Sequence, residues 1–382
     1  MRTYLLSGTD KEEYIFMVAK KAVIITIGDP NPNMGNRLQN YAVQIVLEGL
    51  GFEVESVFFR EKSINWKKYV KKIIHVLTGY KLTKNKPYWR YEIKKIARFE
   101  SFNSKYIRIK RIKRISDIPK ADYYIVGSDQ VWNPQFYIDE KPELAKEIYL
   151  LTFTEPAKKV CFSPSFGIEQ LPNEWISWFK EQLSTFLSFS VREEAGAKII
   201  KELTNRDAIV TVDPTLMLNR ESWNKIAEAP KNIETKKPYI LTYFLSGKSN
   251  RINDDLKNYA ENTNCVVYNL FDIEQPELYM INPSEFIYLT AHANLILTDS
   301  FHACIFSFLY GKPFLVYDRV NMPNMMSRMD TFFEKFNLRR KYVNSGLVNE
   351  LLECDYSKGY EVLKHEQEIM REYLKKTMGI RI

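Results

Sequence analysis

The sequence predicts an α/β protein made of two Rossmann-like halves with a cleft between them. Apolar runs of strand length alternate with longer helical patterns, which is typical of parallel sheets with helical crossovers. A chain of 382 residues is too long for one core of the usual size. The polar stretch AEAPKNIETKKP, residues 227–238, interrupts the pattern, which then restarts as it would at the start of a second domain.

The first half, residues 21–228, contains the predicted elements of one open parallel sheet. Strands are expected at 22–27, 53–59, 123–126 and 159–163, with shorter strands at 189–191 and 209–212. A helix is expected at 36–50, closed by Gly51, with Asn36 as its N-cap and Gln39 three residues later. A second helix is expected at 174–189. Residues 1–20 are expected to form an N-terminal extension without ordered structure.

The second half, residues 229–355, repeats the alternation. Strands are expected at 239–245, 265–270, 294–298 and 313–317, with helices from about residue 253 and at 301–310. A last polar helix at 360–378, in the segment 356–382, is expected to fold back onto the first half. Parallel sheets of this kind bind ligands at the carboxyl ends of their strands, so functional residues are expected in the segments that follow the strands.

Several function classes find no support in the sequence. The four cysteines are far apart and form no CxxC pair, which argues against a disulfide framework or a zinc site. Only four histidines are present and none lies in a metal-binding motif, so we expect no metal. There is no GxSxG elbow, signal peptide or membrane-spanning apolar run, and a cytoplasmic location is expected.

The net charge of +8 comes from one basic segment, at about 60–120, where 20 Lys or Arg face 4 Asp or Glu. This segment is predicted to be an insertion in the first half. Within SINWKKYVKKIIHVLTGY, from Ser63 to Tyr80, apolar residues and lysines fall on opposite faces of a helix. The pattern suits a helix lying on an anionic membrane, and equally a core-packed helix with its lysines outward. No nucleic-acid-binding signature accompanies the charge, so no nucleic-acid partner is expected.

His302 lies in LTDSFHACIFSFLYGKP, which follows a predicted strand and opens a helix. Asp299 or Ser300 is expected to cap this helix, and Gly311 to end it. The free N–H groups and the positive end of the helix favour an anion beside His302. The alternative is a histidine that is only packed at a helix start.

Two other strand ends carry polar side chains. The loop GDPNPNMGNR places Asn36 and Arg37 at a helix start, without a nucleotide-binding glycine pattern. The stretch IVGSDQVWNP brings Asp129, Gln130 and Asn133 to the end of a buried strand, where they could bind sugar hydroxyls. The alternative there is a turn held by Asp129 with an aromatic plug.

Arg192 follows the short strand in FSVREEAGAKIIKEL and precedes a helical run. A guanidinium at that point can fork onto a carboxylate or a phosphate. The alternative is an ion pair with Glu193 or Glu194.

Taken together and in order, GNRLQNYA, IVGSDQVWNP, SVREE, VDPTLML and LTDSFHACIFSFLYGKPF resemble the polysaccharide pyruvyl transferase family, over residues 23–338. The resemblance implies two Rossmann-like domains in the GT-B arrangement. It also implies transfer of a pyruvyl group, as a ketal, from phosphoenolpyruvate to two hydroxyls of a glycan or lipid-linked glycan precursor in capsule or exopolysaccharide assembly. Phosphoenolpyruvate would be the donor substrate, with no further cofactor.

The resemblance places catalytic roles on His302 and Arg192, and the acid and base roles of His302 both stay open. The arginine that the family has two residues before its histidine falls on Ser300. A replacement cation is therefore expected among the predicted anion-binding residues, which are Ser300, Arg319, Lys312, Arg37 and Asn36, while Asp129, Gln130 and Asn133 are predicted to bind the acceptor. Two alternatives remain: a GT-B glycosyltransferase that uses a nucleotide sugar, and a basic scaffold on the inner membrane face or on nucleic acid.

Overall fold

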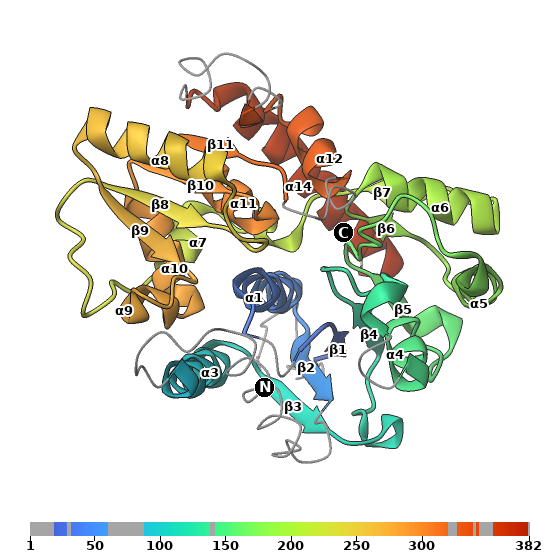
Figure 1. The fold of residues 1–382 in the computed structure, drawn as a ribbon. Helices are drawn as coiled ribbons and strands as arrows, with labels where there is room; N and C mark the ends of the chain where they lie inside the picture. The colour runs from blue at the N-terminus through green and yellow to red at the C-terminus, as the bar shows by residue number, and fades with distance from the viewer. Residues whose placement is uncertain are drawn as a thin grey trace, which may run out of the picture.

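The computed structural model describes residues 19–28, 32–59, 88–137, 142–319, 327–338, 341–343 and 354–380. Two parallel sheets organise these residues (Figure 1). The predicted N-terminal extension, apart from residues 19 and 20, and the amphipathic stretch from Ser63 to Tyr80 lie outside the described residues.

The first sheet has five parallel strands in the order β3-β2-β1-β4-β5, which is the strand order of a Rossmann fold. The strands are β1 (Lys21–Ile25), β2 (Glu53–Phe59), β3 (Ile109–Ile112), β4 (Tyr123–Val126) and β5 (Lys159–Cys161). Strand β3 comes from the basic segment predicted to be an insertion. It pairs in register with β2, so this part of the segment belongs to the sheet.

Both faces of the sheet are buried at β1 and β4, which explains the apolar runs of these two strands. In β1, Ala22 and Ile24 face the core beneath α1 (Met34–Gly49), whereas Val23 and Ile25 face the opposite core. The opposite core includes side chains of α4 (Pro142–Tyr149), α5 (Asn173–Ser184) and α6 (Glu194–Thr204). A separate parallel pair, β6 (Ser190–Val191) and β7 (Ile209–Val210), follows this sheet in the chain.

The second sheet has four parallel strands in the order β11-β10-β8-β9. They are β8 (Tyr239–Tyr243), β9 (Val266–Leu270), β10 (Leu295–Thr298) and β11 (Phe314–Val316). Helix α8 (Asn250–Thr263) covers one face, and α10 (Pro283–His292) and α11 (Phe301–Leu309) cover the other. Helix α10 is not among the elements expected from the sequence. The two facing Rossmann-like halves give the GT-B arrangement, as predicted.

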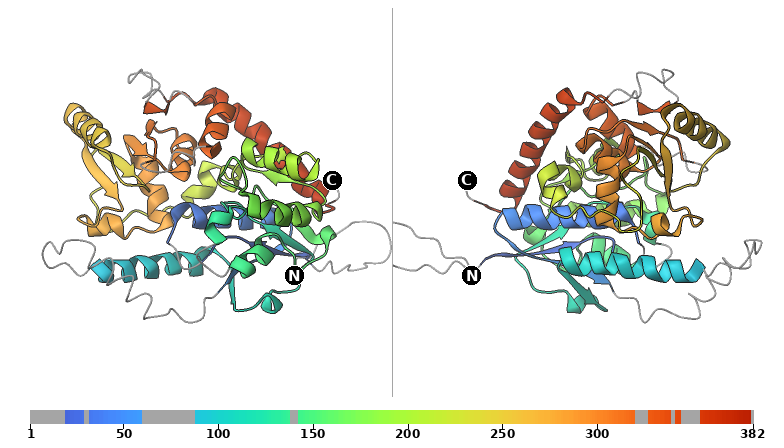
Figure 2. Two further views of the ribbon diagram at one scale, coloured as in Figure 1. Left: turned by 45° about the vertical axis from the view of Figure 1, so that its right-hand side comes forward. Right: turned by 90° about the vertical axis from the view of Figure 1, so that its left-hand side faces the viewer.

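Three helices join the halves. Helix α1 packs against the first sheet on one side and against α10 and the short helix η4 (Pro214–Met217) on the other (Figure 1). Helix α3 (Tyr88–Tyr106) contacts α9 (Pro276–Tyr279) and α10, with an ion pair between Arg98 and Glu285. Helix α14 (Ser357–Thr377) begins at α11, where Tyr360 donates to Phe308, and ends beside Ser188 of the first half (Figure 2).

The remaining short elements connect these layers. They are η1 (Ile115–Asp117), η2 (Pro134–Tyr137), η3 (Pro156–Lys158), α7 (Arg220–Asn224) and α12 (Ser327–Lys335). Among the described residues, no helix is long and apolar enough to cross a bilayer.

Candidate functional site

The site lies where each sheet reverses its strand order, between β1 and β4 in the first half and between β8 and β10 in the second. The chain connections after the two strands at such a point run to opposite sides of the sheet. The carboxyl ends of these strands therefore open a crevice for ligands. The loops after β1, β4 and β10 supply Thr26, Ser128 and Asp299 there, all buried. The two halves thus present their ligand-binding edges to one another.

Two helix N-termini meet at this point. Helix α1 follows β1 and helix α11 follows β10, and a methyl group on Gly35 of α1 would lie 1.9 Å from Nδ1 of His302 in α11. Neither first turn contains an acidic residue that would offset the positive end of the helix. The meeting of two such ends favours an anion.

The cap of α1 differs from the predicted one, whereas one of the two residues predicted to cap α11 stands at its N-cap position. Asn33, rather than Asn36, caps α1, because its side chain accepts a hydrogen bond from the Asn36 N–H at 3.0 Å. Ser300 occupies the N-cap position of α11 without a capping side-chain bond in the described structure. The Asp299 side chain does not cap α11, because its carboxylate accepts hydrogen bonds from the N–H groups of Leu245 and Ser246 at 2.7 and 3.0 Å.

Asp213 is the buried centre of the site, at the start of η4. Its carboxylate accepts a hydrogen bond from Arg192 Nη1, another from Ser128 Oγ at 3.2 Å and a third from the Thr215 N–H at 2.9 Å. His302 Nε2 lies 3.6 Å from its Oδ2 atom. Burial acts to raise the pKa of Asp213, but the charges of Arg192 and His302 outweigh it and hold that pKa far below its usual range.

Arg192 is buried and pairs with Asp213, not with Glu193 or Glu194. The Glu193 carboxylate instead accepts hydrogen bonds from the N–H groups of Phe166 and Gly167 at 2.8 and 3.1 Å. In the described structure, Arg192 Nε and Nη2 are buried without a hydrogen-bond partner, and so is Nε2 of His302. Unpaired buried donors are costly, and a bound anion is a natural partner for them.

Asp129 lines the same site from the loop after β4. It accepts a hydrogen bond from Asn36 Nδ2 at 3.3 Å, and its carboxylate lies 3.8 Å from Arg192 Nη2. Its φ of 76° is in the left-handed region, a strained conformation that often marks functional loops. Burial acts to raise the pKa of Asp129, yet the charges of Arg192, His302 and Arg328 lower it.

The other predicted acceptor-binding residues are buried within their own loop. One end of the Gln130 amide lies 2.9 Å from Asn133 Nδ2, and the oxygen at its other end accepts hydrogen bonds from Arg328 Nη2 and Nη1 at 2.8 and 3.3 Å. Trp132 is buried and donates from Nε1 to the Tyr149 carbonyl at 2.9 Å. Asp129, which is partly exposed, is therefore the member of this group placed to contact a ligand.

Of the five predicted anion-binding residues, three lie at or near the meeting helix ends, one braces a loop and one lies away from the site. Asn36 and Ser300 lie at the meeting helix ends, and Arg319 approaches them, since its Nε donates to the Asp299 carbonyl at 3.4 Å. Arg37 braces the loop after β1, donating to the Gly28 carbonyl at 3.1 Å. Lys312 lies beyond the opposite, carboxyl end of α11, so the structure does not bring it to His302.

Sequence reasoning missed three contributors. Asp213 stands in VDPTLML, where an Asp-Pro pair directly after a short strand was an available signal for a capped turn. Gly35 lets α1 approach His302, and its neighbours in the sequence do not reveal that contact. Arg328 reaches the site from α12 through tertiary packing alone.

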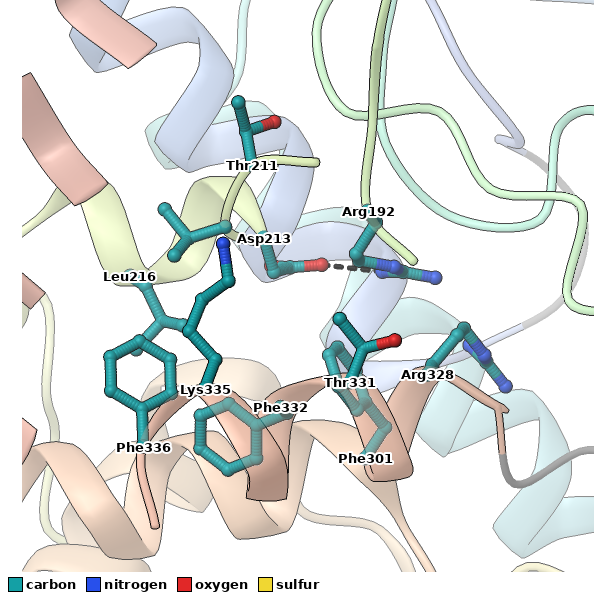
Figure 3. A pocket seen from close by; sticks show the side chains of 11 residues that line it. Arg192, Thr211, Asp213, Leu216, Phe301, Arg328, Thr331, Phe332, Lys335 and Phe336 are labelled. Carbon is teal, nitrogen blue, oxygen red and sulfur yellow. Dashed lines mark hydrogen bonds and ion pairs between the residues drawn. The ribbon is translucent and has the colours of Figure 1, made fainter. Parts of the chain in front are cut away.

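A narrow pocket lies between the halves beside this site. It is lined from the first half by Arg192 and Asp213 and from the second by Phe301, Arg328 and Thr331, among others (Figure 3). Within the described residues, no group of three His, Cys, Asp or Glu side chains is placed to hold a metal ion.

A family model for polysaccharide pyruvyl transferases matches residues 33–319. No curated protein matches the chain. Similar solved structures include a UDP-GlcNAc 2-epimerase from Neisseria meningitidis bound to UDP-GlcNAc, 15% identical, with a TM-score of 0.45 over 93% of this chain and 100% of that one. A glycosyltransferase from Rickettsia africae is 11% identical, with a TM-score of 0.40 over 95% of this chain and 100% of that one.

Replacing Asp213 by Asn is expected to lower the free energy of unfolding at pH 7 by about 3–5 kcal/mol, because Arg192 would remain buried without its counter-ion. Since the folded-state pKa of Asp213 is depressed, its contribution is complete above the unfolded pKa and disappears as the pH falls through the folded one. The difference in the free energy of unfolding between wild type and variant should therefore become smaller below about pH 4. Urea titrations across pH measure it, with Asp207→Asn, an exposed carboxylate, as control; equal effects of both variants would contradict the assignment.

Gly35→Ala is expected to destabilise the protein and reduce activity, because the added methyl group collides with the His302 ring. Helix propensity alone predicts the opposite, since Ala is favoured over Gly within a helix by roughly 0.5–1 kcal/mol. Gly49, near the other end of α1, has open space around it, so Gly49→Ala serves as the matched control. Thermal unfolding compares the two, and a Gly35→Ala protein as stable and active as Gly49→Ala would refute the contact.

Proposed function

The chain belongs to the polysaccharide pyruvyl transferase family, and on that premise we propose that it transfers a pyruvyl group from phosphoenolpyruvate to two hydroxyls of a glycan. The observation that carries the proposal is the convergence of Arg192 and His302, from different halves, on the buried carboxylate of Asp213. Two helix N-termini open at the same point. A small donor with a carboxylate and a phosphate suits this concentration of positive charge.

The reaction needs anion binding and proton transfer, and the site has groups for both. A proton added to the methylene carbon of phosphoenolpyruvate leaves an electron-poor carbon, which one glycan hydroxyl attacks. Phosphate then departs with its bonding electrons, and the second hydroxyl closes the ketal. The two hydroxyls release two protons in all, of which one balances the new methyl group and the other leaves with phosphate.

The surroundings of each residue indicate which of these tasks it performs. Arg192, held by Asp213 through one nitrogen, keeps buried donors for an oxyanion of the donor. His302 can move a proton at Nε2, which has no hydrogen-bond partner among the described residues and lies 3.6 Å from Asp213 Oδ2. Asp129 is partly exposed and can accept hydrogen bonds from sugar hydroxyls.

We place this activity at the cytoplasmic face of a membrane, on a lipid-linked glycan precursor in capsule or exopolysaccharide assembly. The support is the sequence pattern from Ser63 to Tyr80, in which lysines and apolar residues would occupy opposite helix faces. Co-sedimentation with anionic but not with neutral vesicles is the expected result. Equal recovery in the supernatant with both vesicle types would count against this location.

His302→Gln is expected to lower kcat for phosphate release by about 10²- to 10⁴-fold, because positioned acid–base groups contribute that much. Phosphate release from phosphoenolpyruvate and the mass of the ketal product are the measurements, with a panel of glycan acceptors. His365→Gln, at an exposed position on α14, is the control and should keep full activity.

Thermal unfolding of the same protein preparation also tests the alternative function, glycosyl transfer from a nucleotide sugar. Thermal stabilisation by phosphoenolpyruvate is expected, since a ligand that binds only the folded state raises its stability. Stabilisation by UDP without any response to phosphoenolpyruvate, together with no phosphate release, would replace pyruvyl transfer by glycosyl transfer.

A further inference from the structure

Arg328 places a second buried guanidinium beside Arg192. It stands in the first turn of α12, and its side chain and that of Arg192 both pack against the ring of Phe301, with guanidinium carbons 5.6 and 4.8 Å from the ring centre. Figure 3 shows both guanidinium groups pointing to the same side of the pocket. The exposed fractions of the two residues are 5% and 3%, so water solvates neither charge well.

Arg192 has a counter-ion in direct contact and Arg328 does not, because Asp129 and Glu193 act on the charge of Arg328 only from beyond ion-pair distance. Asp213 pairs with Arg192, and Asp129 lies 3.8 Å from it, but in the described structure no carboxylate comes within 4.0 Å of Arg328. Its neighbour is the neutral amide of Gln130, at 2.8 Å. Arg328 Nε is also buried without a hydrogen-bond partner there.

Two like charges held together away from water carry an energetic cost. Burial and then the nearby charge of Arg192 lower the pKa of Arg328 to about 9. A structural role does not explain this arrangement, because an apolar side chain would pack against Phe301 without that cost. An anion between the two guanidinium groups would supply the missing counter-charge and the missing acceptors.

The lining of the pocket favours an anion. Its cations come from both halves, Arg192 from the first and Arg328 and Lys335 from the second. Lys335 also lines it but is engaged by Glu366 at 2.7 Å, so Arg192 and Arg328 are the lining cations best placed for a ligand. The ring of Phe301 gives both guanidinium groups a flat apolar platform, which holds their donor edges in place.

We propose that Arg328 and Arg192, stacked against Phe301, form a two-arginine clamp for an oxyanion of the donor. This inference rests on the proposed function and identifies the cation that serves in place of the one absent at Ser300. Sequence reasoning sought that cation in Arg319, Arg37 or Lys312, whereas α12 supplies it from further along the chain. Arg192 binds the oxyanion from the first half and Arg328 from the second.

The clamp is tested by titrating wild type, Arg328→Gln and Arg328→Lys with phosphoenolpyruvate in a calorimeter. Arg328→Gln should raise Kd about 10- to 100-fold, because hydrogen bonds between charged groups are lost, and Arg328→Lys should recover part of the affinity. Arg206→Gln is the control, because Arg206 also packs on a phenylalanine ring, Phe189, and donates to backbone carbonyls away from the site. Binding by Arg328→Gln within twofold of wild type overturns the clamp, as does equal weakening by Arg206→Gln.

Pyruvate and inorganic phosphate, titrated separately, identify the oxyanion. Loss of pyruvate binding in Arg328→Gln assigns the clamp to the carboxylate, and loss of phosphate binding assigns it to the phosphate. If Arg328→Gln does not fold, as judged by circular dichroism, Arg328→Lys and Phe301→Leu carry the test, and both should weaken binding. Wild type that binds none of these anions also overturns the clamp.

The clamp and the proposed function can fail separately. Wild type that binds phosphate or pyruvate through Arg328, yet releases no phosphate from phosphoenolpyruvate with any acceptor, supports the clamp and refutes pyruvyl transfer. Turnover with an unchanged KM for phosphoenolpyruvate in Arg328→Gln supports pyruvyl transfer and refutes the clamp.

Discussion

The buried carboxylate of Asp213 is the constraint on which the rest of the site depends. A carboxylate without water must be compensated by charge and hydrogen bonds, and Arg192, Ser128 and Thr215 supply both from the first half. A buried ion pair of this kind contributes little net stability, because desolvation offsets the Coulombic attraction. Its effect is orientation: Asp213 fixes one nitrogen of Arg192 and leaves the others for the pocket.

The second constraint is the set of buried polar side chains of α1. They fix the helix whose first turn contacts His302. Gln39 donates to Thr26 Oγ1 at 2.9 Å, and Asn40 accepts from Ser56 Oγ at 2.8 Å. These bonds tie the helix to the strands and loops of the first sheet, while its other side packs against the second half. The first turn of α1 is therefore held firmly, and Gly35 allows the His302 ring to approach it closely.

The sequence predicted the central strands of the sheets well because both of their faces are buried. The run 123–126 was predicted with the observed bounds, since a buried parallel strand is apolar throughout and stops where polar residues begin. The run 53–59 was also predicted with the observed bounds, although Glu53, Glu55 and Ser56 interrupt its apolar residues. The cap of α1 was predicted at the wrong residue, because several adjacent side chains can serve, whereas Ser300, one of the two residues predicted for α11, does stand at its N-cap position. Asn33 caps α1 instead of Asn36. The Asp299 side chain accepts a hydrogen bond from the loop after β8, a tertiary contact that the local sequence pattern does not reveal. Helix α10, with apolar residues all round, lacks the amphipathic period that would have revealed it.

The distinction between local sequence pattern and tertiary contact also separates the predicted residues of the site from those that were missed. His302 and Arg192 each follow a strand, β10 and β6, so the local pattern identified both as strand-end residues, whereas their proximity depends on how the two halves face each other. Arg328 follows no strand, and its place depends on how α12 packs against the first half, where Thr331 accepts a hydrogen bond from the Glu194 N–H at 3.2 Å. The positive charge of the site therefore comes from both halves, and it is complete only in the arrangement that brings α12 against α6. Anion binding and the relative position of the halves depend on the same contacts.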